Sequence, residues 1–353
     1  MAKRPNILLI GHDADLVTRK TFAALAQKGM NILLAKADND STDSQGIDTV
    51  VMPAIHSKFN RKAITALRRI IRQNNIDAIF CASTSALSNA LFANIGTKAK
   101  VIGYRGTQAK VRRLDPTYYI ALLNPRVSHI VCETADIEQY LRHYISADRL
   151  STCPKPYMRE WVTEAAENPK RPDISDDTLT ISYVGITKGR PHKGLHFLVS
   201  AMKILNGRGV KCHLTVVGEA GDADISAAPE NVTFTGNRPD AVSYIAGSRL
   251  FVLPSLRDAS PRVVREAQAC GVPCIVSDIP GARDLILTGP EDESGILVPP
   301  GDPAAIADAI QTLAADRPRY DRMKANATAN IDNNYNFDRY VGFFADTIKG
   351  ILQ

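Results

Sequence analysis

The chain has 353 residues and a formal net charge of +6, with 44% hydrophobic and 23% charged residues, which predicts a soluble protein of two domains. The charge is uneven, with 24 Lys and Arg against 15 Asp and Glu in residues 1–170 but 19 against 22 in residues 171–353, so we expect the first half to meet an acidic partner. The sequence has no apolar run long enough for a signal peptide or membrane span, no Cys-x-x-Cys pair, no histidine spacing typical of metal ligands and no basic-aromatic RNA motif. We therefore expect a cytoplasmic protein with reduced cysteines, and neither a metal centre nor a nucleic-acid partner.

The first expected element is a β-strand at Asn6–Gly11, followed by a helix to Lys28 for which Asp13 or Asp15 provides the N-cap. His12 and Asp13 then lie at the carboxyl end of a strand, where open α/β sheets bind ligands. Two interpretations stay open. His12 or Asp13 contacts a substrate, or the pair is a helix cap beside an incidental histidine.

A basic helix is predicted at residues 57–73. Its cations recur at three- and four-residue spacing and share one face, which contains Lys58, Arg61, Lys62, Arg68, Arg69 and Arg72. The opposite face is apolar and contains Ala63, Ile64, Leu67, Ile70 and Ile71. Such a helix can lie on an anionic membrane surface. It can equally be a packed surface helix whose outer side is basic.

The rest of the first half is expected to hold strands at 78–82, 100–104 and 129–132 and a helix at 135–144. Arg105 directly follows the second of these strands, so it could bind an acidic group of a ligand or be an ordinary loop cation. Residues 153–177 are rich in proline and polar side chains, which indicates a linker between domains.

The second domain is predicted to open with a strand at Leu179–Val184, a loop at 185–194 and a helix at 195–205. The loop is rich in glycine and contains the cations Lys188, Arg190 and Lys193. Backbone amides, the dipole of the following helix and the cationic side chains together make such a loop a good anion site.

A strand–loop–helix–strand unit follows, with strands expected at Leu250–Leu253 and Pro273–Val276. This unit requires parallel strands and a right-handed crossover. Asp258 lies at the carboxyl end of the first strand and Glu266 on the following helix. Two carboxylates at this edge can accept hydrogen bonds from the hydroxyls of a sugar or a ribose. The alternative is that both are solvated acids on an ordinary core unit.

Residues 250–287 resemble the donor site of the retaining family-4 glycosyltransferases, which have the GT-B fold and a Glu-x7-Glu pattern. The pattern here is Asp258-x7-Glu266, together with Ser-Pro-Arg at 260–262, Glu-Ala-Gln-Ala-Cys-Gly at 266–271 and Pro-Gly-Ala-Arg-Asp at 280–284. The resemblance implies that Asp258 touches the transferred sugar and that Glu266 binds the nucleotide ribose. The sequence departs from the family in having Asp for Glu at the first place, one methylene shorter.

The resemblance extends to the basic loop, since Lys193-Gly194 matches the end of the family's diphosphate-binding motif. Ile186 stands where the family usually has an arginine, and the loop is about two residues longer, so Arg190 is the candidate replacement. The catalytic candidates are thus Asp258, Lys193 and Arg190, and the donor-binding candidates are Glu266, Gly185, Gly236, Asn237, Arg238, Ser260, Arg262 and Val263. The acceptor-side candidates are His12, Asp13 and Arg105.

The resemblance implies an α/β protein with the GT-B fold, in which two Rossmann-like domains with parallel sheets face an interdomain cleft. We expect an acceptor-side domain at 1–168, a donor-binding domain at 175–334, and a last helix at about 337–352 that packs back on the first domain.

The function implied is metal-independent, retaining transfer of a sugar from a nucleotide-diphosphate sugar to a glycan or lipid-linked acceptor, in cell-envelope polysaccharide or lipopolysaccharide biosynthesis. The donor is a substrate, and no cofactor is expected. The enzyme would work at the inner face of the membrane, docked through Lys58, Arg61, Arg68, Arg69 and Arg72. Two alternatives remain, an epimerase-like enzyme of the same fold and a non-catalytic, nucleotide-binding scaffold.

Overall fold

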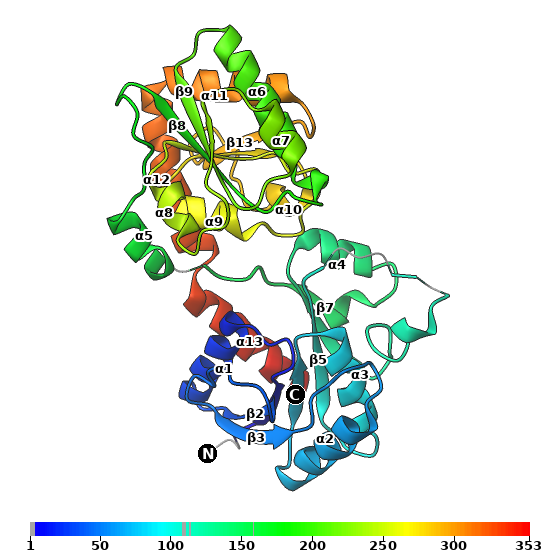
Figure 1. Ribbon diagram of the computed structural model, residues 1–353. Coiled ribbons are helices and arrows are strands. Elements are labelled where there is room, and N and C mark those ends of the chain that lie inside the picture. The colour runs from blue at the N-terminus through cyan, green and yellow to red at the C-terminus, as the bar shows by residue number, and fades with distance from the viewer. Residues whose placement is uncertain (1–3, 108–110, 113, 158) are drawn as a thin grey trace. The chain divides into compact units, whose positions relative to one another are not determined.

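The computed structural model describes residues 4–107, 111–112, 114–157 and 159–353. The chain divides into two compact units (Figure 1): unit 1 is Met1–Pro156 with Phe337–Gln353, and unit 2 is Tyr157–Asn336. The first domain thus ends at Pro156, earlier than the residue 168 expected from the sequence. The reason lies in Tyr157, whose backbone N–H donates to the Tyr335 carbonyl at 2.9 Å and whose ring packs edge-on against Trp161. These contacts join the start of the expected linker to unit 2.

Unit 1 is built on a parallel sheet in the order β3-β2-β1-β4-β5-β6-β7. Its strands are β1 (Asn6–Ile10), β2 (Asn31–Ala37), β3 (Asp48–Met52), β4 (Ala78–Cys81), β5 (Lys100–Arg105), β6 (Val127–Cys132) and β7 (Leu150–Thr152). Its helices are α1 (Leu16–Gln27), α2 (Arg61–Gln73), α3 (Thr84–Ala93), α4 (Ala135–Leu141) and α13 (Phe337–Leu352), with 3₁₀ turns η1 (Pro116–Tyr118) and η2 (Ala147–Arg149).

Helices cover both faces of this sheet, because its central strands are apolar on both sides. One face packs on α1 and α13, where the rings of Phe22, Phe80 and Phe344 meet at centroid distances of 4.9 and 5.5 Å. The other face packs on α2, α3 and α4. The last helix of the chain therefore belongs to the core of unit 1.

Local sequence explains where the helices of unit 1 begin. Asp15 caps α1, since its Oδ1 accepts from the Thr18 backbone N–H at 2.9 Å. Asn60 caps α2 in the same way by accepting from Ala63 N. The five apolar residues predicted for one face of α2 are the five that this helix buries. Of the two caps left open by the sequence, the cap of α1 is thus Asp15 and not Asp13.

Unit 2 is built on a second parallel sheet, in the order β10-β9-β8-β11-β12-β13. Its strands are β8 (Leu179–Val184), β9 (Cys212–Val217), β10 (Val232–Phe234), β11 (Leu250–Leu253), β12 (Cys274–Ser277) and β13 (Gly295–Val298). Its helices are α5 (Thr163–Glu167), α6 (Leu195–Gly207), α7 (Asp222–Ala227), α8 (Ala241–Ala246), α9 (Arg262–Ala269), α10 (Pro280–Arg283), α11 (Pro303–Ala315) and α12 (Arg317–Asn334), with turns η3 (Arg159–Trp161) and η4 (Pro191–Lys193).

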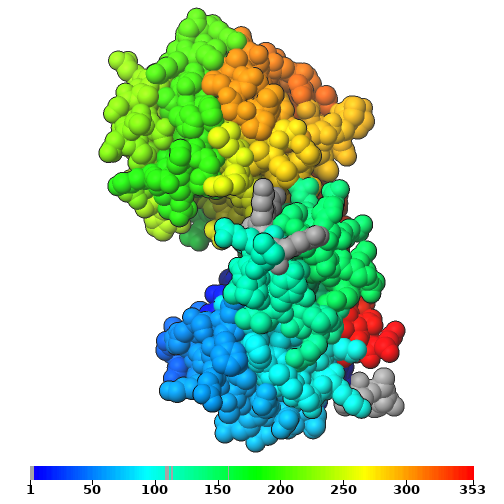
Figure 2. Space-filling model, turned by 90° about the vertical axis from the view of Figure 1, so that its right-hand side faces the viewer, coloured from blue at the N-terminus to red at the C-terminus, as the bar shows by residue number. Residues whose placement is uncertain are grey.

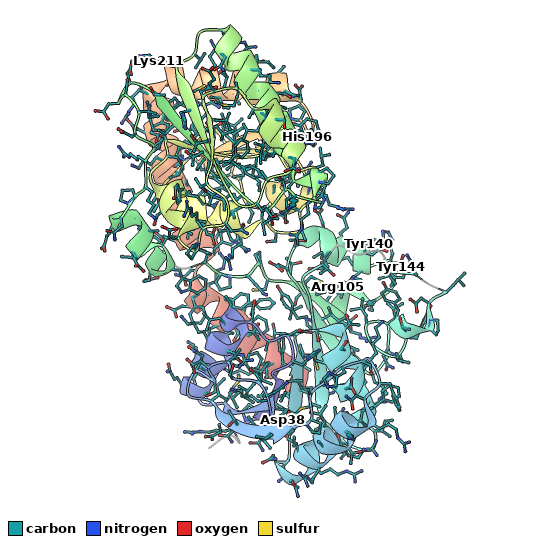
Figure 3. All side chains as sticks on the ribbon, in the orientation of Figure 1. Asp38, Arg105, Tyr140, Tyr144, His196 and Lys211 are labelled. Atoms are coloured by element: carbon teal, nitrogen blue, oxygen red, sulfur yellow. The ribbon has the colours of Figure 1, made fainter. Side chains whose placement is uncertain are left out.

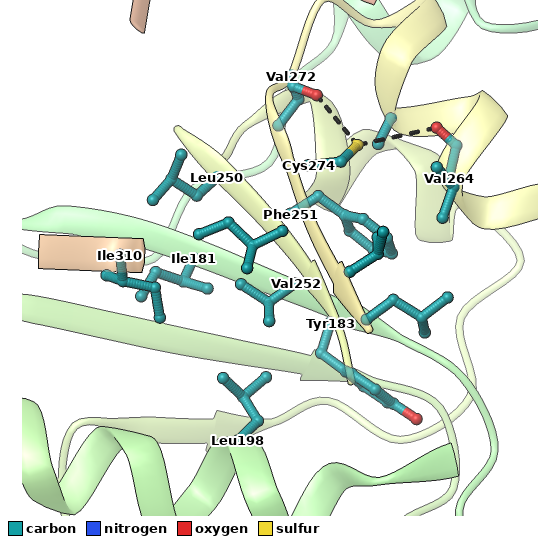
Figure 4. Packing of buried hydrophobic residues seen from close by; sticks show 14 of the residues in the cluster. Ile181, Tyr183, Leu198, Leu250, Phe251, Val252, Val264, Val272, Cys274 and Ile310 are labelled. Carbon is teal, nitrogen blue, oxygen red and sulfur yellow. Dashed lines mark hydrogen bonds between the residues drawn. The ribbon is translucent and has the colours of Figure 1, made fainter. Parts of the chain in front are cut away.

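The core of unit 2 lies around its two central strands (Figure 4). Tyr183 of β8 is fully buried on the side of Leu198 of α6, and Phe251 of β11 is fully buried on the opposite face of the sheet, toward Val264 of α9. The Cys274 thiol of β12 lies 3.4 Å from the Val272 carbonyl oxygen, to which it donates. Close packing on both faces holds the carboxyl ends of β8 and β11 in fixed positions, and the candidate residues follow those ends.

Within the described residues, no helix is both long and apolar enough to cross a membrane.

Candidate active site

Two loops of unit 2 touch each other because one residue of the basic loop is a glycine. Gly194 has φ of +75°, and a Cβ there would lie 1.9 Å from the carbonyl oxygen of Pro254, which follows β11. No larger residue fits this approach without moving backbone. The Leu256 N–H also donates to the His192 carbonyl at 2.8 Å. The loop after β8 and the loop after β11 are therefore fastened together by backbone contacts.

This contact brings two predicted catalytic residues together. Lys193 Nζ lies 2.6 Å from Asp258 Oδ2, and their side chains are 25% and 17% exposed. Partial burial strengthens such a pair relative to one in open solvent while leaving it accessible to a ligand. The backbone of Asp258 also packs against α10, since a Cβ on Gly281 of that helix would lie 2.2 Å from the Asp258 carbonyl oxygen.

The surroundings of this ion pair are strongly cationic. Burial and the nearby positive charges of Arg257, Lys193 and Arg190 together lower the pKa of His192, although Asp258 opposes them. Arg190 thus belongs to the same cluster as Lys193, and its role in place of the family arginine stays a prediction. Arg257 is a cation of the site that the sequence analysis missed. Its position directly before Asp258, in the loop after β11, was the available signal.

Glu266 projects from α9 and is 5% exposed. It accepts a hydrogen bond from Arg262 Nε at 2.9 Å. Burial raises the pKa of Glu266, and the charges of Arg262 and Arg265 only partly oppose that shift. Burying a carboxylate costs free energy unless hydrogen-bond donors surround it, and ribose hydroxyls would provide such donors. Ser260 and Val263, at the start of the same segment, are half-buried.

A cavity of about 390 Å³ lies at the carboxyl ends of β8 and β9. Three predicted donor-binding residues, Gly185, Asn237 and Arg238, line it. Ile186 lines it too, where the resemblance leads one to expect an arginine. Gly236 lies beside the cavity, because its carbonyl accepts from the N–H of Gly218, another lining residue, at 2.8 Å. A small pocket at this edge, lined mainly by apolar residues and glycines, suits a flat ring.

The acceptor-side candidates of unit 1 are only partly brought together. His12 Nε2 lies 3.2 Å from Asp13 Oδ2, and both residues line a cavity of about 440 Å³ with Asp40 and His56. Asp13 has φ of +61°, a left-handed conformation that costs free energy in a residue with a side chain. The carboxylate is 59% exposed, so it remains open to a ligand.

Arg105 is not part of that cavity. It ends β5, which β4 separates from β1 in the sheet. Figure 3 shows it below Tyr140 and Tyr144 of the α4 segment. Burial lowers the pKa of Arg105, against the opposing influence of Tyr118, Cys132 and Tyr140. The three acceptor-side candidates therefore occupy two separate places along one sheet edge.

The largest of the cavities described here, about 1030 Å³, lies elsewhere in unit 1. Lys100 and Val127, the first residues of β5 and β6, line it, so it opens at the amino ends of the strands. Open parallel sheets bind ligands at the opposite, carboxyl edge. None of the predicted site residues lines this cavity, and size alone does not make it the active site.

Helix α2 lies at the surface of unit 1, in the light-blue region of Figure 2. Arg61, Lys62, Arg69 and Arg72 are exposed. Two of the five predicted membrane-docking cations have protein partners instead. Lys58 Nζ donates to Thr117 Oγ1 at 2.7 Å, and Arg68 donates to the Phe92 carbonyl at 2.9 Å. These hydrogen bonds join Arg68 of α2, and Lys58 just before it, to neighbouring segments, and membrane docking through the two residues stays a prediction.

Comparisons with known proteins give matches in both units. Residues 178–316 match the family "Glycosyl transferases group 1", and residues 6–114 match the family "Glycosyl transferase 4-like". The capsular polysaccharide biosynthesis glycosyltransferase CapM of Staphylococcus aureus is 30% identical over 171 residues. That match spans 46% of this chain and 43% of CapM, less than half of the relative's length.

Solved structures extend the likeness to the whole chain. A glycosyltransferase from Rickettsia africae has a TM-score of 0.81 at 16% identity, covering 99% of each chain. HepE of Anabaena, in a complex with UDP, has a TM-score of 0.74 at 15% identity, covering 99% of this chain and 100% of HepE. The predicted GT-B fold is thereby confirmed. The chain has the GT-B fold, and residues in each of its two units match a glycosyltransferase family.

Proposed function

We propose that the protein is a retaining glycosyltransferase, and that unit 2 binds its nucleotide-diphosphate sugar donor. The observation that carries the proposal is the Lys193–Asp258 pair at 2.6 Å, which joins the loops after β8 and β11 near the cavity lined by Gly185 and Arg238, with buried Glu266 on α9, the helix that follows. This edge offers cations for a diphosphate, a carboxylate for a ribose and a pocket for a base. The complex of HepE with UDP supports a donor of this class.

In the proposed reaction the bond between the anomeric carbon and the diphosphate oxygen breaks, and its electron pair stays on the diphosphate. An acceptor hydroxyl oxygen forms the new bond to the same carbon on the same face. Its proton passes to the departing diphosphate oxygen, which is the nearest base on that face. Lys193 and Arg190 stabilise the charge that develops on the diphosphate, and this is the main electrostatic demand of the step.

Asp258 has two roles in this scheme. It accepts hydrogen bonds from hydroxyls of the transferred sugar, and it orients Lys193 through their ion pair. Because Asp is one methylene shorter than the usual Glu, its carboxylate stays close to the Lys193 loop, and the sugar must approach that loop to reach it. Glu266 fixes the ribose. Cationic side chains supply the positive charge, so the reaction needs neither metal nor cofactor, and activity is expected to survive EDTA.

The acceptor is proposed to be a glycan or a lipid-linked glycan of the cell envelope. CapM, a glycosyltransferase of capsular polysaccharide biosynthesis, supports this class. The cavity beside His12 and Asp13 provides a carboxylate and an imidazole, groups that hydrogen-bond sugar hydroxyls. Arg105 would serve an acceptor with an acidic group.

A screen for donor binding and turnover tests the function. UDP, GDP, ADP and their sugar conjugates are added to the protein, and the shift in melting temperature identifies the ligand, because a ligand specific to the folded state raises apparent stability. Proton NMR then follows the chosen donor with candidate acceptors. An α-linked product from an α-linked donor supports the proposal. An inverted linkage removes the retaining mechanism, a free epimerised sugar indicates the epimerase-like alternative, and binding without turnover in every acceptor mixture indicates a scaffold.

The exposed cations of α2 support a second proposal, that the protein works in the cytoplasm and docks on an anionic membrane where a lipid-linked acceptor resides. Each basic residue near such a surface contributes about 1 kcal/mol, and the attraction is screened within about 8–10 Å at physiological salt. Sedimentation with vesicles of rising anionic-lipid content should show binding that salt reverses.

The matched variants for that test reverse two exposed cations each. Arg69→Glu with Arg72→Glu should weaken vesicle binding at least about tenfold. The control is Arg322→Glu with Lys324→Glu, two exposed residues of α12 in unit 2, which should change little. Equal effects of the two pairs, or wild-type protein that ignores anionic vesicles at low salt, would show that α2 is an ordinary surface helix.

A further inference from the structure

The charges around the Lys193–Asp258 pair do not balance. The carboxylate of Asp258 lies among Lys193, Arg190, Arg257 and His192, and a second carboxylate, that of Asp224, acts together with Asp258 on nearby Tyr183. Lys193 is paired with it at 2.6 Å. In the described part of the chain, neither Arg190 nor Arg257 forms an ion pair with a carboxylate. The cluster therefore keeps an excess of positive charge at one point of the sheet edge.

Two other cations of the same region are neutralised. Lys188, which belongs to the same loop as Arg190, forms an ion pair with Glu219 at 2.7 Å. Arg262 forms one with Glu266 at 2.9 Å. An excess of positive charge thus remains where the loop after β8 meets the loop after β11, near the cavity that Arg238 lines. An anion bound there would relieve the repulsion among these cations.

The backbone of Arg257 is held in a fixed relation to the basic loop. The residue before it, Leu256, donates its N–H to the His192 carbonyl at 2.8 Å. The residue after it, Asp258, is tied to Lys193. Arg257 itself is exposed, so its guanidinium is open to a ligand. A guanidinium can bind a phosphate with two parallel hydrogen bonds, which a lysine cannot do.

We infer that Arg257 is a further residue of the diphosphate site, binding the nucleotide's phosphates from the β11 side while the loop after β8 binds them from the other. The inference rests on the proposed donor site and deepens it. Before a ligand binds, Lys193 forms an ion pair with Asp258, whereas Arg257 forms none with a carboxylate of the described chain. Arg257 therefore binds the diphosphate before the reaction starts, so replacing it should weaken nucleotide affinity more than it lowers kcat.

The lowered pKa of His192 is consistent with this arrangement. Arg257 is the first of the charges that act on it, before Lys193 and Arg190, although burial contributes most. The imidazole thus reports a positive potential at the junction of the two loops. That potential is what a bound diphosphate would neutralise.

The test compares nucleoside diphosphates with monophosphates by calorimetric titration, using UDP and UMP, GDP and GMP, and ADP and AMP. Wild-type protein should prefer one diphosphate over its monophosphate. Arg257→Gln should weaken binding of that diphosphate about 10- to 100-fold while changing monophosphate binding much less. Arg257→Lys should restore part of the loss, because the charge returns without the two-bond geometry.

Arg322→Gln is the matched control, since Arg322 is an exposed arginine on α12 of the same unit. It should behave as wild type, and melting temperatures should show that all variants are folded. An unchanged diphosphate preference in Arg257→Gln would overturn the inference and leave the proposed function standing. Wild-type protein that binds none of the three diphosphates or their sugar conjugates would overturn the proposed donor site, and the inference with it.

Discussion

Unit 1 and unit 2 repeat the same strand–loop–helix design, yet their loops differ in what they bring together. In unit 1 the loop after β1 places His12 and Asp13 in one cavity, while Arg105 stands at β5, beyond β4. In unit 2 the loop after β8 touches the loop after β11 at Gly194 and joins Lys193 to Asp258. A sheet edge thus becomes a compact charged site when backbone contacts hold its loops together.

The largest effect is expected from removing a charge of the Lys193–Asp258 pair. Lys193→Ala should lower kcat about 10²- to 10³-fold, because it removes positive charge from the leaving group. Asp258→Ala should also depress turnover while leaving free-nucleotide affinity nearly intact. Steady-state kinetics with the identified donor measures both. Lys211→Ala is the matched control, since Lys211 is another lysine in an ion pair, with exposed Asp177. Full turnover in Lys193→Ala at saturating donor would place the diphosphate elsewhere.

A smaller effect should follow when the backbone contact is broken instead. Gly194→Ala would place a Cβ 1.9 Å from the Pro254 oxygen in a residue with φ of +75°. We expect a loss of about 2–5 kcal/mol in the free energy of unfolding, from the left-handed conformation together with overpacking. Gly189→Ala is the control, because Gly189 has φ of +70° but open space around it, so it should lose only about 1–2 kcal/mol. Urea unfolding with equal losses for the two would contradict the close contact.

The smallest effect concerns pH. Burial raises the pKa of Glu266 above its ordinary value of 4.5, so the folded state binds this proton more tightly than the unfolded chain does. Protonation of Glu266 contributes its full amount to the free energy of unfolding below pH 4.5, and this contribution is lost as the pH rises through the raised pKa. Glu266→Gln cannot titrate, so its stability relative to wild type should increase between pH 4 and pH 8. A difference that stays constant or falls with pH would contradict the raised pKa.

The sequence predicted best where a pattern is local. Strands β8 and β11 begin and end as expected, and the apolar face of α2 is the buried face, since alternation and helical spacing depend on neighbouring residues alone. Edge strand β3 was missed because three of its five residues are exposed and it lacks a continuous apolar run. Polar helix α12 was missed because its buried stripe includes the small Ala327 and the polar Asn330, which weaken the apolar pattern.

The site was harder to predict than the fold, because contacts between distant loops decide it. Sequence spacing places Asp258 and Lys193 at strand ends, but it does not show that they meet. For the same reason the sequence did not indicate Arg257, whose positive charge acts on His192 of the other loop. Likewise, Arg68 and Lys58 were grouped with a solvent-facing set, while the tertiary structure pairs them with Phe92 and Thr117.

The most direct test of the central claim, that the donor site belongs to unit 2, is the affinity of the identified nucleoside diphosphate for matched variants of both units. Glu266→Ala removes a carboxylate from unit 2, while His12→Ala and Asp13→Asn change the cavity of unit 1 and Asn still tolerates the left-handed backbone at residue 13. Calorimetry should show binding weakened about 10- to 100-fold by Glu266→Ala and less than about twofold by the other two. Strong weakening by His12→Ala or Asp13→Asn, with Glu266→Ala like wild type, would contradict the account.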